Sequence, residues 1–391
     1  MLMTQMEKAM AYLDQYQGEM MGLWENLVRL ESPSSDPAAV DKLASHLDTY
    51  CRALGMETEK FRPEGAGTCL AAQTASGDLS PVLLLGHIDT VHPVGSFPGG
   101  AWTVKDDGFV YGPGAHDCKG GLVIALYVIR ALQYAGYDRR QLKLALASDE
   151  ETAHTLSKRQ VVEYLQTTAK GCGAAFTFES GLPDGGVVTR RKGGGIMKLT
   201  ASGLASHAGT APEKGASAVL EAAKKIVAIH ALSDPAHVTY NCGIIHGGTS
   251  ANVVPDHCEV SVAIRFHTNR DCQEAMEQLR TICDTVETPG THCTLGPLVG
   301  FPAMEETERT AELFAVYRSA SEALGLGTPG TVYSAGCSDS AYTTALGIPT
   351  LCAVGVLGAG QHSQNEHARL DSLLTQAKRL TAAILALPDS F

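Results

Sequence analysis

The 391-residue sequence predicts an α/β fold that is interrupted by an inserted α+β segment. Four apolar runs have the length and composition of strands buried on both faces of a sheet: 81–86, 142–147, 174–178 and 348–357. Helical patterns lie beside these runs, which favours a mixed, largely parallel sheet flanked by helices. Between Lys192 and Pro302 polar and apolar residues alternate instead. The alternation indicates a second, different sheet.

Helical patterns dominate the beginning of the chain. They cover residues 1–30 and 38–54, before strand-like segments lead to the first apolar run. The helix that begins near Lys119 is the best marked, because Gly120 opens an apolar segment and Gly136 follows its end.

The segment 193–301 has the pattern of an inserted β-α-β-β-α unit. The three glycines 193–195 indicate a hinge at its start. Its expected elements include a strand over 196–202, a helix over 216–231, a strand over 258–266, a helix over 270–286 and a strand over 291–295. After Pro302 the α/β pattern resumes. We therefore expect a discontinuous domain, 1–192 and 302–391, that carries 193–301 as an insertion.

Composition narrows the functional classes. A formal charge of −12 and a pI near 5.6 argue against nucleic-acid binding, and the basic run 190–192 is too short to offset them. No apolar stretch has the length of a membrane span, and the first residues lack the pattern of a secretion signal. Eleven cysteines without a Cys-x-x-Cys spacing are typical of a reducing compartment. We expect a cytoplasmic protein without nucleic-acid or membrane partners.

Residues of metal-ligand type lie just beyond the strands and at the start of the helix near Lys119: His87, Asp117, Glu151, Glu179 and His362. Parallel strands present such residues at one edge of the sheet. Two imidazoles and three carboxylates suit zinc, and Asp117 has two oxygens with which to bridge a pair of ions. Two ions about 3.5 to 4 Å apart share a hydroxide and polarise a carbonyl. The pattern predicts hydrolytic chemistry.

Neighbouring polar residues have expected supporting roles. Glu150 is adjacent to Glu151, and a turn would aim both at one site, so that one binds metal while the other moves a proton. Asp89 is placed to accept the second imidazole N–H of His87; the alternative is that it caps the loop. Three further residues near these groups are interpreted as structural: His116, Cys118 and His154.

Five motifs together resemble the M20 metallopeptidase family, most closely its glutamate carboxypeptidase (carboxypeptidase G2-like) branch. They are GHIDT at 86–90, GPGAHDCKGG at 112–121, SDEE at 148–151, FES at 178–180 and QHS at 361–363. The resemblance covers nearly the whole chain. It implies a catalytic domain of the zinc-peptidase (phosphorylase/hydrolase-like) type and an inserted lid and dimerisation domain with a ferredoxin-like sandwich.

The resemblance also implies roles for the metal-site residues. Asp117 would bridge two zinc ions, with His87 and Glu179 completing one site and Glu151 and His362 the other, and cobalt or manganese are alternatives to zinc. Glu150 would be the general base, and the peptide bond after Asp117 would be cis. The family usually has glycine after the two glutamates, whereas this chain continues with Thr-Ala-His at 152–154.

Four positions outside the metal site match the family's substrate-binding motifs. His207, in ASHAG at 205–209, would stabilise the oxyanion in a neighbouring subunit's site, which implies a homodimer formed through residues 193–301. Asn252 would lie near the scissile carbonyl, Arg265 would pair with the terminal carboxylate of the substrate, and Gly336 would line the pocket.

The leading hypothesis is therefore a dizinc hydrolase that cleaves the amide bond to a carboxyl-terminal amino acid in a small peptide or N-acyl amino acid. An N-acyl amino-acid deacylase, of the acetylornithine deacetylase or succinyl-diaminopimelate desuccinylase type, or a dipeptidase shares every metal residue. A catalytically inactive metal-binding module and a two-metal phosphoesterase are alternatives from other classes. The intact set of metal ligands disfavours an inactive module. Arg265, which matches a position that binds a substrate carboxylate, disfavours a phosphoesterase.

Overall fold

The computed structural model describes residues 3–391, which divide into two compact units. The first unit contains the chain up to Arg190 together with Glu305–Ser334 and Ser338–Phe391. The second contains Arg191–Met304 and the short segment Ala335–Cys337, which the expected domain division assigns to the first domain. The predicted α/β fold class with an additional antiparallel sheet is confirmed.

The first unit is built on an eight-stranded sheet in the order β1-β2-β6-β3-β7-β17-β8-β16. β3 (Leu79–His87) pairs in parallel with β6 (Arg140–Ala147) and β7 (Ala174–Thr177), and β7 pairs in parallel with β17 (Thr350–Cys352). The flanking strands are β1 (Glu57–Phe61), β2 (Cys69–Gln73), β8 (Val187–Arg191) and β16 (Thr331–Ser334). The parallel strands end at one edge, so the polar residues after β3, β6 and β7 meet there.

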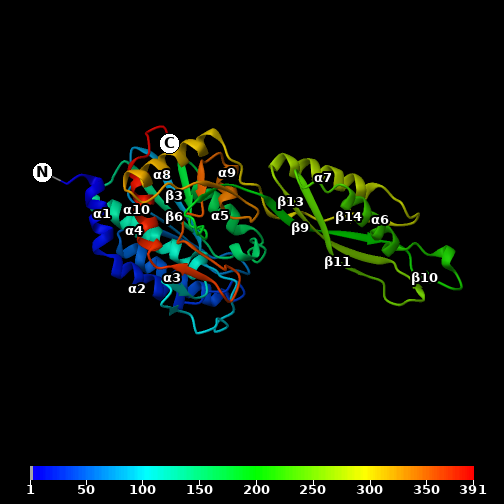
Figure 1. The fold of residues 1–391 in the computed structure, drawn as a ribbon. Coiled ribbons are helices and arrows are strands. Elements are labelled where there is room, and N and C mark those ends of the chain that lie inside the picture. The colour runs from blue at the N-terminus through cyan, green and yellow to red at the C-terminus, as the bar shows by residue number, and fades with distance from the viewer. Residues whose placement is uncertain (1–2) are drawn as a thin grey trace. The chain divides into compact units, whose positions relative to one another are not determined.

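Helices cover both faces of this sheet (Figure 1). The larger core involves α1 (Gln5–Gln15), α2 (Gln17–Arg29), α3 (Pro37–Ala53), α4 (Gly120–Ala135), α8 (Glu308–Ala323) and α10 (Ser372–Leu385). A separate core under the other face involves α5 (Gln160–Ala169), and α9 (Ser340–Ala345) lies beside it. α4 is buried nearly all round, because its residues from Gly120 to Ile129 carry no charged side chain and are mostly apolar. No helix in residues 3–391 is both long and apolar enough to cross a membrane.

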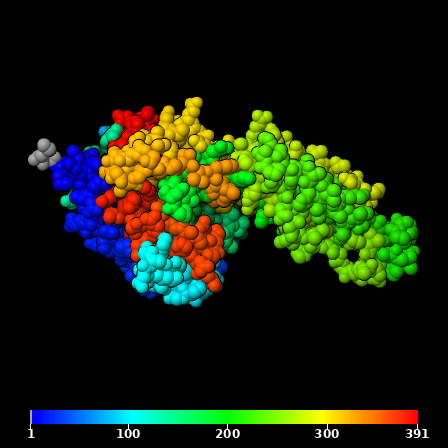
Figure 2. Space-filling model, in the orientation of Figure 1, coloured from blue at the N-terminus to red at the C-terminus, as the bar shows by residue number. Residues whose placement is uncertain are grey.

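The ends of the chain pack together in the first unit. α1 contacts α10, and blue N-terminal atoms adjoin red C-terminal atoms in the space-filling view (Figure 2). Side chains cap the entering helices: Asp36 accepts hydrogen bonds from the first turn of α3, and Thr4 forms a capping box with Glu7 at α1. The helical pattern over residues 1–30 is divided into α1 and α2 at Tyr16, which leaves the helical conformation.

One expected strand is shorter than the sequence suggested. The apolar run 348–357 forms β17 only to Cys352, because Ala353 adopts a left-handed backbone conformation (φ 63°) that ends the extended chain. His362 therefore follows a different sheet, with the order β18 (Gly358–Ala359), β19 (His367–Arg369), β5 (Phe109–Tyr111) and β4 (Thr103–Val104).

The second unit contains an antiparallel sheet in the order β11-β13-β9-β14. These strands are β11 (Val238–Gly247), β13 (His257–Phe266), β9 (Gly193–Ser202) and β14 (His292–Leu295), and β15 (Val299–Phe301) also pairs with β9. α6 (Ala218–Ala231) follows β9, α7 (Asn269–Asp284) follows β13, and both contribute to one core with the sheet. This βαββαβ succession and strand order are those of a ferredoxin-like sandwich.

The predicted hinge at glycines 193–195 is wrong. All three residues lie within β9 and pair with β13. A Cβ on Gly193 would lie 2.0 Å from the Phe266 ring, and one on Gly195 would lie 2.4 Å from the carbonyl oxygen of Val299. The glycines allow a neighbouring ring and strand to approach closely, which a glycine run in a sequence does not distinguish from a flexible joint.

Candidate metal centre

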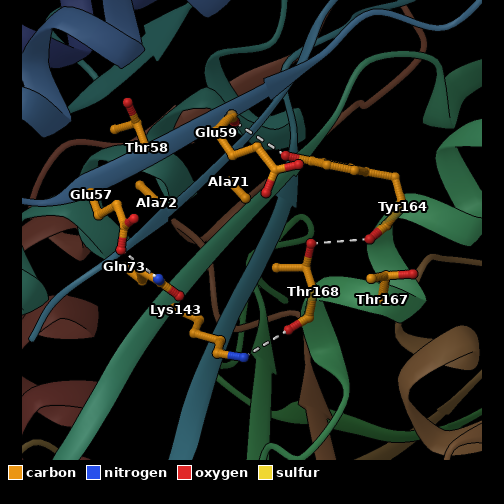
Figure 3. Close-up of a pocket in the computed structure, with 10 residues that line it drawn as sticks. All are labelled: Glu57, Thr58, Glu59, Ala71, Ala72, Gln73, Lys143, Tyr164, Thr167 and Thr168. Carbon is orange, nitrogen blue, oxygen red and sulfur yellow. Dashed lines mark hydrogen bonds between the residues drawn. The ribbon is translucent and has the colours of Figure 1, made fainter. Parts of the chain in front are cut away.

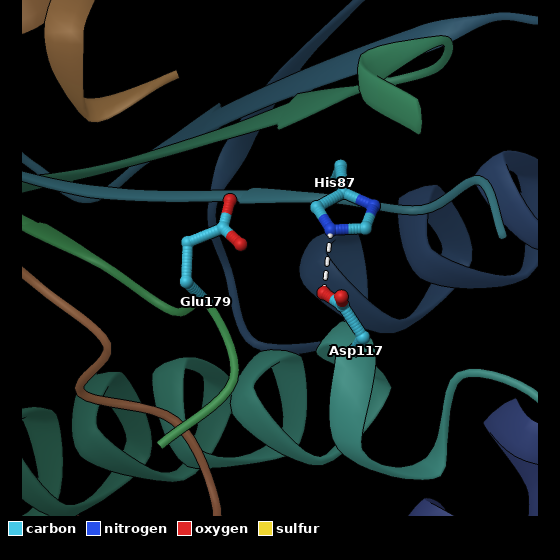
Figure 4. A group of neighbouring side chains, drawn as sticks. All are labelled: His87, Asp117 and Glu179. Atoms are coloured by element: carbon cyan, nitrogen blue, oxygen red, sulfur yellow. Dashed lines mark hydrogen bonds and ion pairs between the residues drawn. The ribbon is translucent and has the colours of Figure 1, made fainter. Parts of the chain in front are cut away.

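Two groups of metal-ligand side chains lie at the carboxyl edge of the parallel strands. The ligand atoms of His87, Asp117 and Glu179 lie within 4.8 Å of one another, and so do those of Asp117, Glu151 and His362. Figure 4 shows the first group, in which Glu179 faces the same space as His87 and Asp117. Asp117 belongs to both groups, which is the arrangement that the sequence resemblance implies.

His87 is oriented for ligation. Its Nδ1 lies 3.0 Å from the main-chain oxygen of Asp89, to which it donates, and its Nε2 lies 3.1 Å from Asp117 Oδ1. A neutral imidazole that donates through Nδ1 turns its Nε2 lone pair toward the carboxylate. Two facing electron-rich atoms require a cation between them, either a proton or a metal ion. The donor set therefore fits a divalent metal.

Asp117 is held in a turn just before α4. Its backbone leaves helical geometry (φ −115°, ψ 92°), and the Asp117–Cys118 peptide bond is cis, as the resemblance implies. Burial opposes ionisation of this carboxyl group. Hydrogen bonds from His362 and His87 outweigh burial and hold the pKa of Asp117 well below its usual range.

The two adjacent glutamates occupy a single helical turn, Glu150–Thr152, directly after β6. His362 Nε2 lies 2.9 Å from Glu151, whereas Glu150 belongs to neither ligand group. Burial, followed by the charge of Glu179, raises the pKa of Glu150 well above its ordinary value. Burial also raises the pKa of Glu151, to about 7.

Asp89 supports the glutamate turn more directly than it supports His87. Its carboxylate accepts hydrogen bonds from the main-chain N–H groups of Glu150 and Glu151, both at 3.1 Å, and from the Ser34 hydroxyl at 2.7 Å. Its Oδ1 is 3.5 Å from His87 Nδ1, farther than its own main-chain oxygen. The predicted contact with the imidazole is thus made mainly by the Asp89 carbonyl, and the carboxylate orients the turn.

Glu366 is a residue of this site that the sequence reasoning missed. Its buried carboxylate accepts from the main-chain N–H groups of His116 at 2.9 Å, Asp117 at 3.0 Å and Gly114 at 3.2 Å, and it lies 3.0 Å from His92 Nε2. It therefore fixes the turn that carries Asp117. The available signal was its place four residues after His362.

We expect Glu366→Gln to weaken both the fold and metal binding. The amide NH2 group would face main-chain N–H donors, so at least one buried hydrogen bond is lost. The free energy of unfolding should fall by about 1–3 kcal/mol, and metal affinity by about tenfold. Urea unfolding and metal titration measure the two effects. Glu312→Gln, on the exposed face of α8, is the control. If the two variants have the same free energy of unfolding and the same metal affinity, Glu366 does not fix the turn that carries Asp117.

His207 and Asn252 lie together in the second unit. His207, in β10 (Ser206–His207), pairs with Val253 of β12 (Val253–Val254), and the Asn252 carbonyl accepts from Ala208 N–H. His207 Nδ1 accepts from the N–H groups of Gly209 at 3.1 Å and Thr210 at 3.2 Å. Because Nδ1 is an acceptor, Nε2 carries the hydrogen, and this exposed imidazole is a ready donor.

Arg265 and Gly336 also lie in the second unit. Arg265 is exposed on β13, and its guanidinium group donates to the neighbouring carbonyl of Ile264 at 2.9 Å. The Gly336 carbonyl accepts from Arg191 at 3.2 Å. The substrate-binding roles of these residues and of His207 and Asn252 remain predictions.

A separate cavity of about 210 Å³ lies on the first unit, between β1, β2, β6 and α5 (Figure 3). Glu57, Glu59 and Lys143 are among its lining residues, and Lys143 Nζ donates to the Thr168 carbonyl. None of the predicted site residues lines it. Its polar walls do not extend the metal centre.

Comparisons with known proteins agree with this geometry. The model of peptidase family M20/M25/M40 matches residues 83–386. The chain is 26% identical to carboxypeptidase G2 of Pseudomonas sp. (strain RS-16), over 87% of this chain and 82% of that protein. It is 27% identical to succinyl-diaminopimelate desuccinylase of Corynebacterium glutamicum, over 70% of this chain and 72% of that protein.

Solved structures show the same fold. An M20 family metallo-carboxypeptidase from Sulfolobus solfataricus superposes with a TM-score of 0.75 at 16% identity, over 94% of this chain and 99% of the other. The family match spans most of the chain, including every residue of the metal centre. The chain therefore belongs to peptidase family M20/M25/M40 and is a metal-dependent hydrolase.

Proposed function

We propose that the protein is a dizinc carboxypeptidase that cleaves the amide bond to a carboxyl-terminal amino acid, as the glutamate carboxypeptidase-like members of the family do. The observation that carries the proposal is the pair of ligand groups that share Asp117, beside a Glu150 that belongs to neither. Cobalt and manganese are alternatives to zinc, since the same nitrogen and oxygen donors bind them.

The residues divide the chemical work. A divalent pair bound by the five ligands would supply a Lewis acid that polarises the carbonyl and acidifies water. Glu150, with its raised pKa, takes a proton from the attacking water at its carboxylate and then gives it to the departing nitrogen. Asp89 holds the turn that aims Glu150. His207 donates from Nε2 to the developing oxyanion, and Asn252 and Gly336 position the substrate beside it.

Arg265 is proposed to select substrates with a free carboxylate. Losing a charged hydrogen bond costs about 1.5–3 kcal/mol, so we expect Arg265→Ala to raise KM by about ten- to a hundredfold. An amide-capped analogue should show no such change. Arg270→Ala, an exposed arginine paired with Glu274, is the control. An equal loss for both substrates would contradict recognition of the carboxylate.

A homodimer formed through residues 193–301 is part of the proposal, because His207 would act in a neighbouring subunit's site. In its support, β11 is an edge strand of its sheet and carries the exposed residues Ile244 and Ile245. Sedimentation should give a mass near twice that of the chain. A strictly monomeric active enzyme would contradict the action of His207 in another subunit. We propose a cytoplasmic location, since all eleven cysteines are free thiols.

The deciding experiment combines metal analysis with a substrate panel. The panel contains dipeptides with a free terminal carboxylate, N-acetyl and N-succinyl amino acids, and a control peptide whose terminal carboxylate is capped as an amide. Preference for the peptides supports the carboxypeptidase. Preference for the N-acyl compounds favours the second candidate, a deacylase, whose desuccinylase relative is 27% identical over 70% of this chain, compared with 26% over 87% for the carboxypeptidase. Metal binding without hydrolysis of any member would contradict both.

A further inference from the structure

His154 lies at the centre of a buried charge cluster next to the glutamate turn. Its Nδ1 is 2.9 Å from Asp149 Oδ1, and its Nε2 is 2.6 Å from Asp339 Oδ1. All three side chains are excluded from solvent. Each ring nitrogen faces a carboxylate oxygen, so both nitrogens donate and the ring is an imidazolium. From the sequence alone, this histidine is interpreted as structural.

The two carboxylates connect the imidazole to both sides of the metal centre. Asp149 directly precedes Glu150 and also accepts from Ser157 N–H at 2.8 Å. Asp339 directly follows Ser338, whose hydroxyl donates to Glu179 at 3.1 Å. Glu179 follows β7, and the glutamate turn follows β6. His154 thus joins two chain segments that carry opposite sides of the site.

The backbone at this turn needs such a restraint. Ala153 and His154 have φ values of 52° and 57°, in the left-handed region that residues other than glycine seldom occupy. Such conformations persist only where surrounding contacts hold them. At His154 those contacts are the two buried ionic hydrogen bonds to Asp149 and Asp339.

The charge of the imidazole is strongly favoured. Burial alone would lower the pKa of His154. The charge of Asp339 and the hydrogen bonds to Asp149 and Asp339 outweigh burial and raise the pKa to about 10. At neutral pH the cluster therefore holds one cation between two carboxylates.

We propose that His154 is a positioning residue, which clamps Asp149 to Asp339 and so fixes Glu150 and Glu151 relative to Glu179. The inference rests on the proposed function, in which Glu150 moves the proton and Glu151 binds metal. It adds a contact from the segment 152–154, where this chain departs from the family's usual sequence after the glutamate pair.

The main test is His154→Gln, which keeps much of the volume but cannot donate to both carboxylates. Disturbed support of metal ligands typically lowers activity or metal affinity by about 10- to 100-fold. We expect kcat per folded, metal-loaded molecule to fall in that range, with KM changed by less than about threefold. Zinc should also bind more weakly. Tyr342→Phe is the matched control, because it changes a side chain whose ring lies 5.7 Å from the His154 ring and leaves His154, Asp149 and Asp339 in place.

A second pair of variants tests the same contact in case His154→Gln does not fold. Asp339→Asn keeps an oxygen that accepts from Nε2, whereas Asp339→Ala does not. We expect the asparagine variant to retain most of the wild-type kcat and the alanine variant to lose it. The kcat of the double variant His154→Gln/Asp339→Ala should be no lower than that of the poorer single variant. Both substitutions remove the same contact, the one between His154 and Asp339.

The proposal is overturned if folded, metal-loaded His154→Gln or Asp339→Ala has the wild-type kcat and zinc affinity, whatever its stability. Zinc affinity separates this result from failure of the proposed function. If the wild type hydrolyses no substrate, the clamp still predicts weaker zinc binding in His154→Gln than in Tyr342→Phe, because Glu151 is displaced. Equal zinc affinities in those two variants would then overturn it.

Discussion

Glu150→Gln should bind its full complement of metal and yet hydrolyse substrate about a thousandfold more slowly, within the range of general acid–base catalysis. Glu150 lies outside both ligand groups, so replacing its carboxylate leaves the metal donors untouched. Glutamine has nearly the same shape but accepts no proton from water. The measurements are kcat on the preferred substrate and metal content after dialysis.

Two comparisons sharpen the Glu150 prediction. Glu151→Gln changes a ligand and should lose metal together with activity, although it alters the adjacent residue in the same way. Glu163→Gln, exposed on α5, should change neither quantity. If Glu150→Gln retains the wild-type rate with metal bound, another group moves the proton and the division of labour between the two glutamates is wrong.

The grouping of the candidate ligands was predictable because three of them follow strands that the sequence marks clearly. His87 ends β3, Glu151 follows β6 and Glu179 follows β7, and these parallel strands are neighbours. His362 is predicted by its residue type and motif, although the strand before it is β18 and not the predicted strand over 348–357. It lies in a loop after β18 with a left-handed backbone (φ 61°), and no periodic pattern indicates such a position.

The supporting contacts were not predictable in the same way. Glu366 reaches the main chain of Asp117 across 249 residues, and His154 reaches Asp339 across 185. Neither residue belongs to a pattern that names its partner. The glycines at 193–195 failed for a related reason: what they accommodate, the Phe266 ring and strand β15, becomes adjacent only in the folded sheet. Local patterns predict elements, whereas long-range contacts decide how a site is held.

Asp117→Ala should remove metal from both positions, while His362→Ala should remove it from one. Asp117 belongs to both ligand groups, and without it each group retains one imidazole and one carboxylate, too few for a tetrahedral zinc site. Without His362 the group of His87, Asp117 and Glu179 stays complete. We therefore expect about two zinc ions per chain in the wild type, about one in His362→Ala and far less than one in Asp117→Ala.

Folding must be separated from metal loss in this comparison. Asp117 is buried and contacts both imidazoles, so its removal also destabilises the chain. Circular dichroism should first show that each variant is folded at the temperature of the metal analysis. A chelator should then lower the melting temperature of the wild type but not of Asp117→Ala, because only a protein that binds metal is stabilised by it. If Asp117→Ala holds as much zinc as His362→Ala, the two ligand groups do not share their carboxylate. The two-ion centre on which the proposed hydrolysis rests would then have to be abandoned.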